Sequence, residues 1–111
     1  MVSIEKVKNG FIRFIDTDIM PKLPWGKQVG LGIYVGLAAE VIGKLPEQYK
    51  DHPAIAMLEV FDDAGNVDID RIYNAAAPYF EGEKHTIPIP LIADLKVDRQ
   101  DLDRLYDMIL N

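Results

Sequence analysis

The sequence contains no cysteine. This absence excludes disulfide bonds, thiolate zinc sites and cysteine nucleophiles together, and it favours a reducing compartment, so we expect a cytoplasmic protein. Histidine is scarce as well, because His52 and His85 are the only two in the chain. Since histidine is the most frequent catalytic base, the chain offers little material for acid–base chemistry.

Clusters of basic residues are also missing. The 12 Lys and Arg residues are spread along the chain and are outnumbered by 18 Asp and Glu residues, which gives a formal net charge of −6. Nucleic-acid binding depends on clustered positive charge that neutralises phosphates, so we expect no nucleic-acid partner. A cation or a basic protein surface is the electrostatically favoured partner.

The sequence also lacks an apolar run long enough to span a membrane. Residues 29–39 are uncharged but the run ends at Glu40, whereas a transmembrane helix needs about 20 apolar residues. The first ten residues alternate charged and apolar side chains and do not resemble a secretory signal. We therefore expect one domain over residues 1–111, with a helical pair at 1–45 and a sheet-and-helix part at 54–111.

The N-terminal part is expected to form two helices. Ser3 can cap a helix whose apolar residues recur every three or four positions as far as Ile19. Prolines at 21 and 24 then enforce a turn. Residues 29–45 predict a second, largely buried helix that ends before Pro46.

Three glycines lie in the uncharged run 29–39 of the second predicted helix, at positions 30, 32 and 36. A glycine inside a helix costs about 1 kcal/mol relative to alanine, so their presence predicts close approach of a neighbouring backbone. Gly32 and Gly36 are one turn apart and have the spacing that lets two helices touch.

The C-terminal part is expected to contain two β-hairpins, each followed by a helix. Apolar runs at 57–61 and 67–69 flank an Asp/Gly/Asn turn, and a helix over 71–80 follows, capped by Asp68 or Asp70. The second hairpin uses residues 86–92 and 95–97 with a turn near Ala93-Asp94, and Asp98 with Asp101 opens the last helix.

The predicted fold class is therefore α+β, with four strands in one small antiparallel sheet. The residues expected in its core are Val7, Phe11, Phe14, Ile15, Leu31, Val35, Leu58, Val60, Ile72, Leu91, Leu102, Leu105 and Ile109.

A short internal repeat occurs in the second half. The sequence Asp-Ile-Asp-Arg-Ile-Tyr-Asn at 68–74 recurs 33 residues later as Asp-Leu-Asp-Arg-Leu-Tyr-Asp at 101–107. Either the second half contains two copies of a hairpin-and-helix unit, or two helix starts have converged on similar residues.

Several segments together carry a resemblance to a known group of proteins. They are the N-terminal helix ending in Met-Pro-Lys-Leu-Pro, the Gly-rich apolar helix, the turn Asp-Asp-Ala-Gly-Asn-Val-Asp-Ile-Asp and the closing Asp-Leu-Asp-Arg-Leu-Tyr helix. In this layout the chain resembles small proteins of unassigned activity encoded by phages and prophages of Gram-positive bacteria. The resemblance implies a structural or accessory role and brings no catalytic residues with it.

The acidic turn is a candidate cation site. Its oxygen-bearing side chains are those that a hard cation such as calcium prefers, but the EF-hand register fails, because Val67 stands where the sharp-turn glycine belongs and Tyr73 where the closing glutamate belongs. Turn and helix-cap roles are the favoured interpretation, and weak divalent-cation binding is an alternative. The candidate ligands are Asp62, Asp63, Asn66 and Asp68.

No catalytic motif is present. The chain lacks a Gly-x-Ser-x-Gly elbow, a His-Glu-x-x-His pair and a phosphate-binding loop, and the glycines at 30, 32 and 36 miss the dinucleotide-binding spacing by one residue. We therefore expect no enzymatic activity, no catalytic residues and no cofactor.

The two N-terminal helices contain more apolar surface than a small sheet can cover. We therefore expect a non-enzymatic module that associates with itself, or with another phage or host protein, through a surface containing Trp25, Gly32, Ile33 and Gly36. The alternative is association with a membrane surface, because Trp25 lies between Lys22 and Lys27 beside the apolar run, as in an interfacial anchor.

Overall fold

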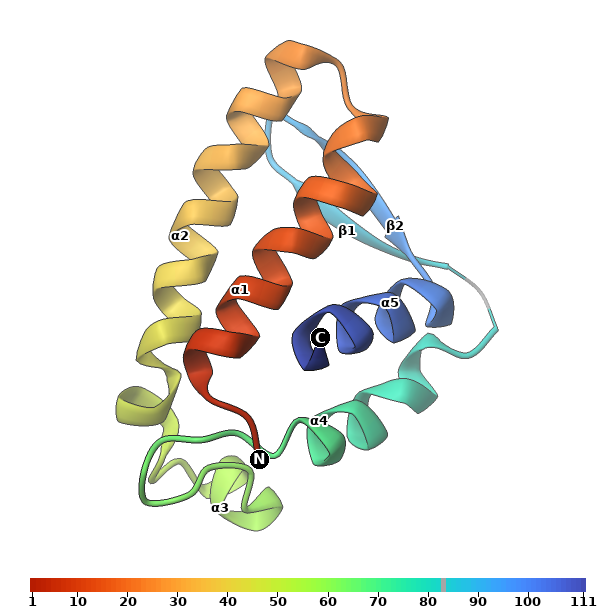
Figure 1. The fold of residues 1–111 in the computed structure, drawn as a ribbon. Helices are drawn as coiled ribbons and strands as arrows, with labels where there is room; N and C mark the ends of the chain where they lie inside the picture. Colours follow the sequence, from red (N-terminus) through yellow and green to blue (C-terminus); the bar gives the residue numbers. More distant parts are fainter. Residues whose placement is uncertain (83) are drawn as a thin grey trace.

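A computed structural model of the chain describes residues 1–82 and 84–111 and has an α+β fold (Figure 1). A two-stranded antiparallel sheet pairs β1 with β2. Three short helical segments interrupt or extend the α-helices: η1 (Ile15–Ile19, a π-helix), η2 (Met20–Lys22) and η3 (Ala77–Phe80), the last two of 3₁₀ type. The main elements are α1 (Ile4–Phe14), α2 (Trp25–Tyr49), α3 (Pro53–Leu58), α4 (Ile69–Ala76), β1 (His85–Ile89), β2 (Ala93–Val97) and α5 (Arg99–Leu110).

α1 is the central helix. It packs against both α2 and α5, and α2 lies along one edge of the molecule (Figure 1). Its predicted cap is present, because the Ser3 hydroxyl accepts a hydrogen bond from the Lys6 N–H at 3.1 Å. The helical path continues through η1, where Ile15 and Ile19 are buried, which confirms the helix expected over residues 4–19.

α1 and α5 approach each other closely at Gly10. A Cβ atom added there would lie 2.5 Å from the Ile109 Cα atom of α5, so only glycine fits at this crossing. The sequence predicted close approach of a neighbouring backbone at the glycines of the second helix. In the structure, the close approach of another backbone is found at Gly10 of α1.

The second helix is longer and more exposed than predicted. It begins at Trp25 and ends at Tyr49, and Pro46 lies inside it. An internal proline removes one backbone hydrogen bond and crowds the preceding turn at a cost of about 3 kcal/mol, but it does not forbid the turn that follows. The prediction that Pro46 ends this helix was therefore wrong.

The first predicted hairpin is not observed. Residues 53–58 form α3, which begins with Pro53 and is capped by the His52 Nδ1 atom accepting from the Ala54 N–H at 3.2 Å. Strand pairing there is limited to the isolated bridges Phe61–Val67 and Val2–Val67. Proline favours the first position of a helix, and the alternating run at 57–61 is too short to outweigh it.

The second hairpin is confirmed, with His85 paired to Val97 and Ile89 to Ala93. Its turn covers residues 90–92 and not the predicted Ala93-Asp94, and Leu91 in that turn has φ 67° and a fully exposed side chain. Within the described residues the sheet therefore has two strands in place of the expected four.

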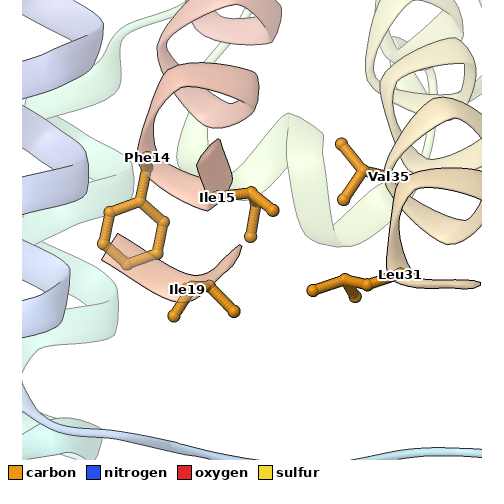
Figure 2. Close-up of a cluster of buried hydrophobic side chains, with 5 residues drawn as sticks. All are labelled: Phe14, Ile15, Ile19, Leu31 and Val35. Atoms are coloured by element: carbon orange, nitrogen blue, oxygen red, sulfur yellow. The ribbon is translucent and has the colours of Figure 1, made fainter. Parts of the chain in front are cut away.

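The core lies between the N-terminal helices. Figure 2 shows Ile15 and Ile19 next to Leu31 and Val35 of α2, with the Phe14 ring on the side of the cluster away from α2. Burial is confirmed for the predicted core residues Phe14, Ile15, Leu31, Val35, Val60 and Ile109, and Val7, Phe11, Leu102 and Leu105 are partly buried.

Three predicted core residues are exposed, namely Leu58, Ile72 and Leu91. Leu58 was expected to face the core from a strand that is in fact a short helix, and Leu91 stands at the tip of the hairpin turn. Ile72 lines an open apolar groove between α3, α4 and the end of α2, so its side chain is not covered by another described element.

Candidate interaction surface

The outer face of α2 carries an apolar stripe that no other described part of the chain covers. A residue with a large apolar side chain recurs at every fourth position, which places these residues along one side of a helix. We call them the outer stripe: Trp25, Val29, Ile33, Leu37 and Val41, with 79, 53, 65, 57 and 51% of their surface exposed. The opposite side of the helix holds Leu31, Val35 and Ala39, all buried.

Gly32 and Gly36 lie beside the outer stripe. A Cβ atom at Gly36 would meet no atom within 4 Å, and one at Gly32 would meet only the flexible Met20 Cε at 3.9 Å. By contrast, a Cβ atom at Gly30 would lie 2.3 Å from the Ile92 side chain, so this glycine serves the inner packing. Gly32 and Gly36 are therefore not required by contacts within the molecule.

The four residues predicted to form the interaction surface are thus brought together on one exposed helix face. Trp25 and Ile33 belong to the outer stripe, and Gly32 and Gly36 flank it. Sequence reasoning missed the stripe's other members, Val29, Leu37 and Val41, although the four-residue spacing from Trp25 would have found them.

Charge is absent from most of this face. α2 has no charged residue between Lys27 and Glu40, and charges return only in its C-terminal part. Among the described residues, α2 is long and apolar enough to cross a membrane by length and composition. Its most apolar window of 18 residues has a mean hydropathy of 1.4, and only 17% of that window is buried. The prediction that this helix is largely buried was wrong, because its outer side chains are exposed. Its length exceeds the predicted one, because it starts at Trp25 and passes Pro46.

The molecule also exposes more surface than its mass requires. Its accessible surface is 7241 Å². A compact monomer of 12.5 kDa exposes about 6,200 Å², so the excess is about 1,000 Å². A standard protein interface buries about 800 Å² on each partner. The excess therefore corresponds to roughly one interface.

The acidic turn is organised by its own hydrogen bonds. One oxygen of Asp62 accepts from the backbone N–H of Ala64 at 3.0 Å and of Asn66 at 2.8 Å, and the other accepts from the Asn66 side chain at 3.0 Å. Asp68 caps α4 by accepting from the Arg71 N–H at 3.2 Å, and Asp63 is exposed. Over the described residues no group of three acidic or histidine side chains is placed to hold a metal ion. These contacts are the turn and cap roles expected from the sequence.

The two histidines have different neighbours in the fold. His52 caps α3, and His85 packs edge-on against Phe80 with ring centroids 5.2 Å apart. Neither lines the open groove beside Ile72.

A polar cluster between α4 and α5 was not foreseen. The Tyr73 hydroxyl donates to Asp103, and the Tyr106 hydroxyl donates to Asp70. These are equivalent positions of the 33-residue repeat, so the two copies contact each other reciprocally, with the tyrosine rings 4.7 Å apart. Arg99 completes the cluster by donating to the Tyr73 oxygen at 2.9 Å.

The pKa values in this cluster follow from these hydrogen bonds. The bond from Tyr73 lowers the pKa of Asp103, and the bond to Asp70 raises the pKa of Tyr106. Neither tyrosine lines the open groove beside Ile72. We therefore assign the cluster to the joining of α4 and α5 and not to chemistry on a substrate.

Acid is expected to destabilise the fold below about pH 4. The pKa of Asp18 is lowered below 3.8, first by its hydrogen bond from Arg104 at 2.6 Å, and the pKa of Asp62 is lowered by hydrogen bonds from Asn66. A carboxyl with a lowered pKa in the folded state stabilises that state above its unfolded pKa, and the contribution is lost as the pH falls through the folded pKa. The free energy of unfolding in urea at pH 6 and pH 3 measures the loss. The variant Asp18→Asn should lose less on acidification than the natural chain, and a stability that rises between pH 5 and pH 3 would contradict the assignment.

Comparison with known protein families, with curated proteins and with solved structures finds no match to this chain. The resemblance to phage and prophage proteins therefore rests on the sequence motifs alone.

Proposed function

We propose that this protein is a non-enzymatic interaction module that pairs with a second copy of itself through the outer face of α2. The observation that carries the proposal is the outer stripe, whose five large apolar side chains are all at least half exposed. Apolar patches of this kind mark interaction sites, and the excess accessible surface is of the size that one interface buries. A structural or accessory role in a phage assembly, which the motif resemblance implies, is compatible with such a module.

The outer stripe is suited to a two-fold partner because it is symmetric about Ile33. A two-fold axis at Ile33 would set two α2 helices antiparallel, with Trp25 opposite the partner's Val41 and Val29 opposite the partner's Leu37. Two-fold pairs are the commonest oligomers, and glycines beside the contact allow helices to approach closely. Gly32 and Gly36 would supply that approach, since nothing within the chain occupies the space above Gly36.

Electrostatics support the antiparallel arrangement. It places the end of α2 that carries Lys27 near the end of the partner helix that carries Glu40, so opposite charges lie close together. The helix dipoles are also opposed in this arrangement, which is favourable. A parallel pair would place like charges at the same level.

Single-cysteine cross-linking is the sharpest test, because the natural chain has no cysteine. We expect Ile33→Cys to form a disulfide-linked dimer under mild oxidation, since the axis brings the two thiols together. Trp25→Cys and Val41→Cys should cross-link when mixed and not when oxidised alone. Asn74→Cys, exposed on α4, is the matched control and should remain monomeric on a denaturing gel. Cross-linking of Ile33→Cys no faster than the control would refute the pairing.

Membrane association is the second candidate function, and the length and hydropathy of α2 are the observations that favour it. The net charge of −6 opposes binding to the anionic lipids of a cytoplasmic leaflet. In addition, the inner side of α2 is engaged with α1. Sedimentation with neutral phosphatidylcholine vesicles distinguishes the two: the self-association proposal expects the chain to stay in the supernatant.

A further inference from the structure

α1, α2, the β-hairpin and α5 line an apolar pocket of about 300 Å³ that is partly open to solvent, and its lining residues Tyr34 and Ile87 are 41 and 47% exposed. Phe14 lines it from α1, Leu31 and Val35 from α2, Leu102 from α5, and Ile87 and Leu95 from the hairpin. Leu31, Phe14 and Val35 are at least 90% buried, so this part of the wall is interior and not surface.

Two polar residues adjoin the pocket, and each has its hydrogen bond elsewhere. The Asp101 carboxylate accepts from the Asp98 N–H at 3.0 Å in the cap of α5. The Tyr34 hydroxyl donates to the Pro90 carbonyl at 3.4 Å, which ties α2 to the hairpin turn. The pocket lining contains no lysine, arginine or histidine.

Water is therefore poorly held in this space. An ordered water needs two to four polar partners, which this apolar lining does not supply, so an apolar molecule can displace the water there at little cost. The carbon atoms of an unfilled wall also lack the dispersion contacts that a packed core supplies. An apolar occupant would restore those contacts, and its size is limited to that of about ten water molecules.

We propose that this pocket binds one small uncharged apolar molecule, an alkyl chain or an aromatic ring system of about that size. Fatty-acid carboxylates are disfavoured because the only charged wall residue is Asp101 and the chain carries a net charge of −6. An alcohol or a hydrocarbon meets no such repulsion. The proposal does not depend on self-association, because Leu31 and Val35 lie on the side of α2 opposite the outer stripe.

The test uses N-phenyl-1-naphthylamine, an uncharged dye whose fluorescence rises in apolar surroundings. We expect saturable binding of one dye per chain, displacement by 1-decanol, and displacement by decanoate that is at least tenfold weaker. Ala38→Phe should reduce dye affinity at least tenfold, because Ala38 lines the pocket and a phenyl ring there would fill it. Ala54→Phe places the same ring on exposed α3 and should bind the dye as the natural chain does.

A second measurement keeps the test decisive if Ala38→Phe does not fold. With methyl-labelled protein, nuclear Overhauser contacts from the dye should reach Leu31, Ile87 and Leu95. Contacts confined to Val29, Ile33 and Leu37 would place the dye on the outer stripe and overturn the proposal. Absence of saturable binding to the natural chain, or equal binding by a folded Ala38→Phe variant, would overturn it as well. Failure of the cross-linking test leaves these outcomes unchanged, so the two proposals fail separately.

Discussion

Gly10→Ala is expected to lower the free energy of unfolding by about 2 kcal/mol, in the range of overpacked cores. The new Cβ atom would lie 2.5 Å from the Ile109 Cα atom and 2.8 Å from its backbone nitrogen, so no side-chain rotation can relieve the clash. α1 and α5 would have to separate along the interface that holds the C-terminal helix to the rest of the fold. Urea denaturation followed by circular dichroism measures the change.

Gly43→Ala is the matched control for this substitution. A Cβ atom at Gly43 of α2 meets nothing within 4 Å, and alanine is favoured over glycine inside a helix by about 0.5–1 kcal/mol. The same chemical change should therefore stabilise the chain at Gly43 and destabilise it at Gly10. Equal effects at the two positions would show that α1 and α5 do not meet as described.

Replacing Gly32 and Gly36 together by leucine is expected to abolish self-association while leaving the chain folded. Leucine has a higher helix propensity than glycine, and the space above both glycines is open apart from the Met20 Cε atom at 3.9 Å. In a dimer, the two leucines would hold the helices apart and remove contacts along the outer stripe. We expect the dissociation constant to rise at least 100-fold, measured by sedimentation equilibrium.

Asn9→Leu adds the same side chain at an exposed position of α1 and is the control for the leucine pair. Its dissociation constant should match that of the natural chain. A folded Gly32→Leu/Gly36→Leu variant that associates as tightly as the control would show that this face is not the interface.

The local signals in the sequence predicted individual elements well. Ser3 and the pair Asp98 and Asp101 form the helix caps that their spacing indicates, because such hydrogen bonds depend only on neighbouring residues. The second hairpin was also found, although its turn was displaced. The turn is displaced because Leu91 adopts a left-handed conformation that its residue type does not favour.

Features that depend on contacts between residues distant in the sequence could not be predicted from local sequence patterns. A short apolar run such as residues 57–61 suits a strand or a helix equally, and α3 was decided by Pro53 and the His52 cap. The repeat was visible, but its reciprocal contacts between Tyr73 and Asp103 and between Tyr106 and Asp70 require knowing that α4 and α5 pack together.

The candidate interaction surface was likewise predicted only in part. The sequence predicted one surface containing Trp25, Gly32, Ile33 and Gly36, although Trp25 was expected to precede a helix that begins at residue 29. It did not show that this face is exposed. Periodicity cannot indicate which side of a helix is covered when nearly every position is apolar, as in residues 29–39.

The mass of the natural chain in solution tests self-association most directly. Multi-angle light scattering over a range of concentrations should give a mass that rises towards twice the chain mass of 12.5 kDa and then stays constant. In a closed two-fold pair the outer stripe of each chain is already covered by the other chain, so larger species are not expected. A mass that stays at 12.5 kDa at millimolar concentration would contradict the account.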